Sequence, residues 1–397
     1  DAAYRCGQCM DEYRDALSIE LLSARLQAKR ASGEDTSFTL DRLALELYYQ
    51  GKYDEAEPLF REALKVKRAT LGNRHPDTLS SSRHLGGLLQ AKGDLSAAEP
   101  LHREALTGMR EALGHRHRGT LMCINNLGTL LKDKGDFAAA EPLLREAVKV
   151  MRETLGNRHP STLNSVGNLG SLLQAKGNLA AAEPLYREVV KVQRETRGNR
   201  HPNTLMAIGS LGLLLKDKGD LATAELLLRE ALEVSRETLG SRHPSTLISI
   251  SSLGVLLVAK GKYKEAEPLC REALEVQRET RGNRHPNTLI FIHNLGAVLV
   301  AKGKYEEAEP LCREVLEVWR ETLGNRHPYT LKAISSLNKL LLARGPLGRG
   351  ILRLARVAAK LYGGPRRLMC GARRLAVGTR ARFGPRSASV APSVCGS

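Results

Sequence analysis

Aromatic residues are scarce in this chain of 397 residues. It holds one Trp, five Phe and ten Tyr, which together make up 4% of the sequence. A core without large rings is built from Leu, Val and Ala, which suits closely packed helices better than β-sheets, where aromatic and β-branched residues are enriched. The hydrophobic fraction is an ordinary 42%, so the composition favours a folded helical protein.

Long apolar runs are also lacking. The longest, from about Leu289 to Ala301, is interrupted by His293 and Asn294, whereas a membrane-spanning helix needs about 20 mostly apolar residues. No basic-then-apolar leader is present, so no secretory signal is predicted. The seven cysteines lack the spacing of a disulfide framework, which indicates free thiols in a reducing compartment. We therefore expect no membrane span and a cytoplasmic location.

Chemical motifs that stand apart from the general pattern of the chain are missing too. There is no Gly-rich phosphate loop, no nucleophile elbow and no isolated pair of carboxylates. The Glu of each Arg-Glu-Ala-Leu segment recurs along the chain, so we interpret it as a helix-face charge. The sequence predicts a non-enzymatic protein with no catalytic, cofactor-binding or metal-binding residues.

Acidic residues are absent from the C-terminal part. Residues 344–397 contain twelve Lys or Arg and no Asp or Glu, so the net charge of +18 falls to +6 for the rest. Residues 363–397 are rich in Gly, Arg, Ser and Pro, which predicts a disordered basic tail. Three interpretations stay open: a solvated tail, a segment that meets phosphates or acidic lipid, or untranslated sequence read as coding. Aromatic residues that would stack on bases are nearly absent from it, so nucleic acid is not an expected partner.

What the sequence does contain is a repeat of constant length. One histidine recurs every 42 residues at positions 75, 117, 159, 201, 243, 285 and 327, and one glycine at 51, 93, 135, 177, 219, 261 and 303. A constant period indicates one structural unit stacked on copies of itself, which is a solenoid.

Each unit is predicted to be a pair of helices. In residues 78–119, helical spacing of Leu predicts a first helix from Thr78 to Lys92 and a second from about Leu95 to Leu113. Gly93 suits the left-handed conformation that ends a helix, and Asp94 suits the cap that starts the next one. A proline recurs inside the second helix, where we expect it to bend or loosen the first turns.

Several recurring residues are predicted to serve packing. Gly86 and its copies on the first helix favour close helix crossing, opposite Ala98 and its copies. Cys270 and Cys312 share one slot and are predicted core residues. The loop histidines lie in repeats about 8–10 Å apart, too far to share a metal ion about 2 Å from each nitrogen, so we expect them to shape the loop. Cys6 and Cys9 form only half of a zinc motif.

The repeat resembles a known family. Leu85-Gly86, Leu89, Ala98 and Ala105 are similar to the tetratricopeptide pattern. The 42-residue length, the Ala-Glu-Pro-Leu and Leu-Gly-x-x-His-Pro segments, and the stretch from Ile124 to Gly128 resemble the repeats of kinesin light chains. The resemblance covers about residues 36–344. It implies an all-α, right-handed superhelical solenoid of tetratricopeptide-like repeats.

These observations predict four parts. We expect a degenerate half-repeat and lead-in over residues 1–35, and seven 42-residue repeats over 36–329. An eighth first helix with a capping helix would span 330–362, and the basic tail 363–397.

The resemblance also implies a concave face lined by the first helices, at their second, fifth, ninth and twelfth positions. These positions vary between copies, as expected of a recognition surface. The candidate peptide-groove residues are Arg83, Asn125, Lys132, Asn164, Gln174, Leu213, Lys216, Ile248, Val255, Val258, Ile290, His293 and Val300. The apolar members are predicted to bind apolar side chains, and the three cationic ones acidic groups. Alternatively, the C-terminal segment of the chain covers the apolar end.

The leading functional prediction is a non-catalytic scaffold or adaptor that binds peptide segments of a protein cargo. The resemblance implies the cargo-binding region of a kinesin light chain, a microtubule motor adaptor, and thus a location near the cytoskeleton. It also implies a kinesin heavy chain as partner, but residues 1–35 lack the heptads that family members use for it. The alternative is a regulatory repeat array of a larger signalling protein.

Overall fold

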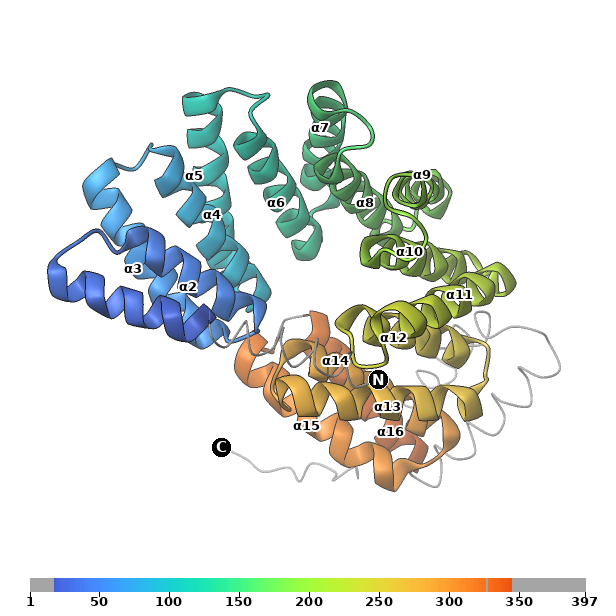
Figure 1. Ribbon diagram of the computed structural model, residues 1–397. Helices are drawn as coiled ribbons and strands as arrows, with labels where there is room; N and C mark the ends of the chain where they lie inside the picture. Colours follow the sequence, from blue (N-terminus) through green and yellow to red (C-terminus); the bar gives the residue numbers. More distant parts are fainter. Residues whose placement is uncertain (1–17, 326–327, 345–397) are drawn as a thin grey trace, which may run out of the picture. The chain divides into compact units, whose positions relative to one another are not determined.

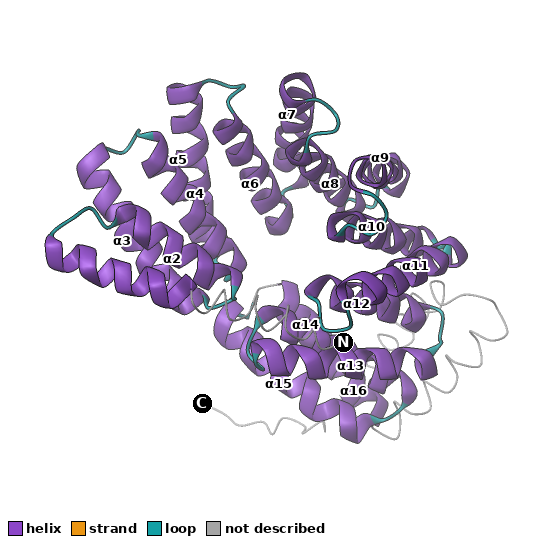
Figure 2. Cartoon of the chain, viewed as in Figure 1, coloured by secondary structure: helices purple, strands orange, loops and turns teal. Residues whose placement is uncertain are grey.

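The computed structural model describes residues 18–325 and 328–344, and every regular element in these ranges is a helix (Figures 1 and 2). The helices are α2 (Ser37–Tyr49), α3 (Tyr53–Leu71), α4 (Pro76–Ala91), α5 (Leu95–Leu113), α6 (Arg118–Lys134), α7 (Phe137–Leu155), α8 (Pro160–Ala175), α9 (Leu179–Arg197), α10 (Pro202–Lys218), α11 (Leu221–Leu239), α12 (Pro244–Ala259), α13 (Tyr263–Arg281), α14 (Pro286–Lys302), α15 (Tyr305–Leu323) and α16 (Pro328–Arg344). The chain divides into two compact units, residues 1–334 and 335–397, with the boundary inside α16. The predicted helical solenoid is confirmed for the described part.

Seven helix pairs, from α2 and α3 to α14 and α15, form the repeats, and each helix packs on the next along the chain. The second helix of the second repeat, α5, has the predicted bounds, while α4 begins two residues earlier than expected, at Pro76. The recurring proline lies inside a continuous 19-residue helix in each copy, as Pro58 does in α3. Residues 18–32, upstream of the first pair, are also helical.

Six of the recurring histidines, from His75 to His285, cap first helices in the described part of the chain. Nδ1 of His75 accepts a hydrogen bond of 3.2 Å from the backbone N–H of Asp77. The same cap forms at His117, His159, His201, His243 and His285. Each cap satisfies a backbone donor that the helix leaves unpaired, and it requires an unprotonated Nδ1. The predicted role of these histidines in shaping the loop is confirmed.

A glycine on the first helix and a side chain on the second set how closely the two helices pack. A Cβ added at Gly128 would lie 2.7 Å from Leu144, and one at Gly254 would lie 3.1 Å from Sγ of Cys270. The prediction that this glycine lies opposite the recurring alanine was wrong. Gly128 faces Leu144, four positions after Ala140 on the second helix. Cys270 is buried as predicted, and burial raises the pKa of its thiol to about 11.

Ion pairs join the second helices of neighbouring repeats. Arg68 on α3 donates to both carboxylate oxygens of Glu104 on α5, at 2.8 and 2.7 Å. The same pairing recurs between Arg110 and Glu146, Arg152 and Glu188, Arg194 and Glu230, Arg236 and Glu272, and Arg278 and Glu314. The recurring glutamate is therefore a helix-face charge, as predicted. Arg30, upstream of the first pair, binds Glu62 in the same way.

In each of the first six repeats, a second glutamate binds two or more cationic side chains. Glu225 binds Lys260, Lys262 and Arg229, and these hydrogen bonds, that from Lys260 first, lower its pKa to about 2. Isolated surface pairs stabilise proteins by less than about 1 kcal/mol each, so the effect of these pairs lies in the network they form along the array.

His102 on α5 is a buried histidine at the contact between the two helices of the second repeat. The ring faces Gly86, and neither of its nitrogens has a hydrogen-bond partner among the described residues. Burial, followed by the charge of Arg83, lowers its pKa to about 4. A His with a lowered folded pKa stabilises the protein above its unfolded pKa of about 6.5. This stability, about 3 kcal/mol, is lost as the pH falls from 6.5 towards 4. His102→Leu, which copies Leu144 and Leu228, should raise the melting temperature at neutral pH and reduce its decline at pH 4.5, as followed by circular dichroism. An unchanged decline would contradict this assignment, and His117→Leu, at an exposed cap, is the control.

Candidate functional site

The first helices of successive repeats contact one another directly. α4 lies beside α6, α6 beside α8, α10 beside α12, and α12 beside α14 (Figure 1). The second helices instead meet through the long side chains of their Arg–Glu pairs. We call α4, α6, α8, α10, α12 and α14 the first-helix layer. All thirteen predicted groove residues lie on it.

The fifth position of the first helix faces the next repeat. Asp41 on α2 binds Lys67 on α3, and Ser81 on α4 donates to the same carboxylate oxygen at 2.6 Å. Lys67 also lies 3.1 Å from the hydroxyl of Ser81. All three side chains are buried. This position therefore contributes to a junction where three helices meet.

The same junction recurs with other residues two repeats later. Asn125 donates to Ser165 at 2.6 Å, and Ser165 lies 2.9 Å from the sulfur of Met151. In the last junction, the ring of His293 lies 5.7 Å from that of Trp319. Variation at this position thus accompanies variation in the residues that it packs against.

The structure consequently gives three predicted groove residues packing contacts. Asn125 is buried in its junction and His293 contacts Trp319. Arg83 occupies the equivalent position on α4, its Nη2 lies 2.7 Å from Nε2 of His84, and burial lowers its pKa. These contacts make Arg83, Asn125 and His293 weaker candidates for peptide binding than the remaining ten.

The polar candidates at the twelfth position face carboxylates and hydroxyls of the layer itself. Lys132 lies 3.4 Å from Asp133 and 3.3 Å from the hydroxyl of Ser171. Lys216 lies 3.0 Å from Asp217. Gln174 donates to Asp217 at 2.7 Å, whereas Asn164 is exposed. The positive charge of both lysines is thus already balanced.

The apolar candidates lie together on three neighbouring helices. Leu213 is on α10, Ile248, Val255 and Val258 are on α12, and Ile290 and Val300 are on α14. None of these six side chains is fully buried, and Ile248 is 41% exposed. Met206 on α10, next to this set, is 48% exposed. The repeats from the fifth to the seventh therefore present an apolar surface.

The described residues also bear on metal binding and on membrane spanning. They include no group of three or more His, Cys, Asp or Glu side chains placed to hold a metal ion, and the motif of Cys6 and Cys9 lies outside them. None of the described helices is both long and apolar enough to cross a membrane. Residues 345–397, which include the predicted capping helix and basic tail, are also outside the described part.

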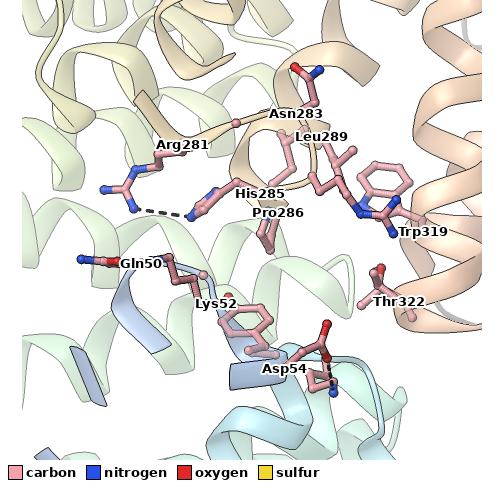
Figure 3. A pocket seen from close by; sticks show the side chains of 18 of the residues that line it. Gln50, Lys52, Asp54, Arg281, Asn283, His285, Pro286, Leu289, Trp319 and Thr322 are labelled. Carbon is pink, nitrogen blue, oxygen red and sulfur yellow. Dashed lines mark hydrogen bonds and ion pairs between the residues drawn. The ribbon is translucent and has the colours of Figure 1, made fainter. Parts of the chain in front are cut away.

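The sequence did not predict one cavity, whose walls include residues of both the first and the seventh repeat. It is about 470 Å³ in volume, and it lies between the α2–α3 turn and the loop that joins α13 to α14 (Figure 3). Trp319 and Ile290 line it. Trp319, the only tryptophan of the chain, was the one sequence feature that could have pointed to this cavity. The residues next to it in the sequence gave no indication that the first repeat forms the opposite wall.

Comparison with known proteins identifies the repeat. A family model described as tetratricopeptide repeat matches residues 35–111, 82–153, 120–195, 158–237, 211–279 and 245–308, and a second model of the same description matches 288–329. No curated protein matches the chain.

Three solved structures are similar to the chain. A putative kinesin light chain with nearly identical TPR-like repeats from Podosopora anserina is 28% identical, with 52% of this chain and 98% of that chain covered and a TM-score of 0.45. A Rap protein complexed with competence and sporulation factor is 11% identical, with 73% and 76% covered and a TM-score of 0.57. The Rap conjugation gene regulator of plasmid pLS20, in complex with the Phr* peptide, is 12% identical, with 78% and 75% covered and a TM-score of 0.50. The two Rap structures show a shared fold.

The buried pair of Asp41 and Lys67 gives a prediction about the junctions. Asp41→Asn alone leaves a buried ammonium without its counter-charge, which costs about 3–5 kcal/mol. Lys67→Met alone leaves the carboxylate unpaired at a similar cost. The double variant copies Asn125 and Met151 with Ser81 already in place, so it should recover most of the stability. Thermal unfolding of the four proteins measures the coupling, and additive losses would contradict it.

Proposed function

The chain belongs to the tetratricopeptide repeat family, and from this premise we propose that its first-helix layer binds a peptide segment of a partner protein. Tetratricopeptide arrays are protein-interaction scaffolds. We place the binding surface on α10, α12 and α14, where the partner docks apolar side chains. The observation that carries this proposal is the apolar surface formed by Leu213, Ile248, Val255, Val258, Ile290 and Val300.

Exposure of this surface supports the proposal. In the first-helix layer, the twelfth position is Gln90, Lys132, Gln174 and Lys216 in the second to fifth repeats and Val258 and Val300 in the sixth and seventh. Contiguous apolar surface in contact with water is costly, and such patches mark interaction sites. An extended or helical peptide with spaced apolar anchors would remove it from water.

The charges of the layer refine the expected partner. Lys132 and Lys216 already face Asp133 and Asp217, and a partner carboxylate would have to compete with these aspartates. We therefore propose that apolar anchors supply most of the affinity. Acidic groups of the partner near these lysines would then affect association rate and orientation more than affinity.

The finer role that we propose is that of a cargo-binding adaptor similar to the repeat region of a kinesin light chain. The 42-residue unit and the stretch from Ile124 to Gly128 support it. A protein of the same fold binds the Phr* peptide, which supports a peptide ligand for this architecture. Association with a kinesin heavy chain, and thereby with microtubules, belongs to the same proposal.

A charge placed in the apolar surface tests the proposal. Val258→Asp should weaken binding of a fluorescein-labelled peptide that contains acidic and aromatic residues by about tenfold or more, because the new carboxylate loses its water on contact with the peptide. Fluorescence anisotropy measures the affinity. Val234→Asp is the matched control, since this half-buried valine lies outside the first-helix layer, on α11, the second helix of the preceding repeat. Equal affinities for the two variants, or no binding to the wild type, would overturn the proposal.

A further inference from the structure

The α2–α3 turn lies against the loop between α13 and α14 (Figure 3). Nη1 of Arg281 donates a hydrogen bond of 3.3 Å to the carbonyl oxygen of Tyr49. A Cβ added at Gly51 would lie 2.5 Å from the ring of His285. At the equivalent turn glycines Gly135, Gly177, Gly219 and Gly261, an added Cβ would have no neighbour within 4 Å. Of these five turns, only that of the first repeat is packed against a distant loop.

The contact leaves a cavity with apolar walls. Tyr53 comes from the first repeat, while Leu289, Ile290, Trp319 and Tyr329 come from the seventh repeat and the start of α16. The ring of Trp319 stacks on that of Tyr329, with 5.3 Å between centroids. The volume of about 470 Å³ lies within the range of pockets that hold small molecules.

Two cations line the same cavity without a carboxylate partner among the described residues. Lys262 and Lys304 occupy the slot of Lys52 in later repeats, and each donates to a glutamate of the preceding repeat. Lys52 and Arg281 have no such ion pair in the described ranges, although Glu55 is also among the lining residues.

Apart from Glu55, the other charged or titratable groups of the cavity wall are paired or neutral. Arg284 binds Glu321 at 2.6 Å, and Lys92 binds Asp54 at 2.7 Å. Burial, and then the charge of Arg281, lowers the pKa of His285 to about 4, so this ring is uncharged at neutral pH. Within the described ranges, the two cations Lys52 and Arg281 thus exceed the one carboxylate without an ion pair, Glu55, and the cavity wall keeps a net positive charge.

We propose that this cavity binds an amphipathic anion, a carboxylate carried by a short aryl or alkyl group. The carboxylate lies between Arg281 and Lys52, where charge-assisted hydrogen bonds are strong, and the apolar group lies against Trp319 and Ile290. Because the walls come from the first and seventh repeats, a ligand that fills the cavity stabilises the contact between them. The site shares only Ile290 with the residues named for the proposed peptide surface.

Trp319 provides the measurement, because it is the only tryptophan of the chain and lies in the cavity wall. Titration with phenylbutyrate should change its fluorescence saturably, and the uncharged phenylbutanol should bind more weakly. Arg281→Leu copies Leu239, which occupies the same slot in the fifth repeat, and should weaken phenylbutyrate binding by about tenfold.

Arg197→Leu is the matched control. Arg197 occupies the same slot and lies 3.1 Å from its loop histidine, His201, as Arg281 lies 3.4 Å from His285, but it does not line the cavity. Wild-type affinity is expected for it. Equal affinities of the two arginine variants, equal binding of acid and alcohol, or no saturable change in the wild type would each overturn the site.

A pair of glycine variants tests the contact between the repeats. Gly51 and Gly135 both have positive φ, 77° and 83°, so alanine strains both turns alike. The added Cβ meets His285 only in Gly51→Ala. Gly51→Ala should therefore weaken phenylbutyrate binding and Gly135→Ala should leave it unchanged. Wild-type affinity of both variants would show that the ligand does not need the contact.

Discussion

In the second to seventh repeats, the contact between a glycine on the first helix and a side chain on the second sets the distance between the two helices, and the rest of the array depends on it. Gly128 meets Leu144 and Gly212 meets Leu228, at a position where an added Cβ would lie 2.7 Å from the facing leucine side chain. Glycine in the interior of a helix costs about 1 kcal/mol relative to alanine, so its recurrence indicates that close packing offsets this cost. Because the distance between the two helices is the same in these repeats, each of them contacts its neighbours through equivalent surfaces. The Arg–Glu pairs between second helices consequently recur with one geometry, from Arg68 and Glu104 to Arg278 and Glu314.

This regular frame permits variation of two different kinds. At the ninth and twelfth positions of α12, Val255 and Val258 are only half-buried, so a change there affects the neighbouring repeat less. At the fifth position, Asp41 and Asn125 are enclosed by side chains of two further helices. A change there requires a matching change in its neighbours, as the sets Asp41–Lys67–Ser81 and Asn125–Met151–Ser165 illustrate. Variation between copies therefore marks a recognition surface only where the varying side chain has no partner in the next repeat.

The sequence predicts the fold well because the relevant interactions are local. The period determines the helix pairs, the His–Pro segment determines where α4 starts, and Gly93, with a positive φ, follows its end as expected. The burial of Asn125 was not predictable from its own helix, because it depends on Ser165 in the following repeat. The contact of Tyr49 with Arg281 spans 232 residues. Its geometry is the sum of small rotations at successive junctions, and no single repeat contains that information.

The two proposed sites share one residue, Ile290, which belongs to the apolar surface and also lines the cavity. A side chain that contributes to two binding sites couples them, and linkage requires the coupling to be reciprocal. An anion in the cavity holds the apolar side chain of Ile290 against Trp319 and away from a peptide on α14. A peptide that draws Ile290 towards itself opens the cavity wall in turn. Given both proposals, the physical consequence is antagonism between the two ligands. The coupling free energy cannot exceed what the contacts of Ile290 contribute to binding, because the anchors on α12 do not line the cavity.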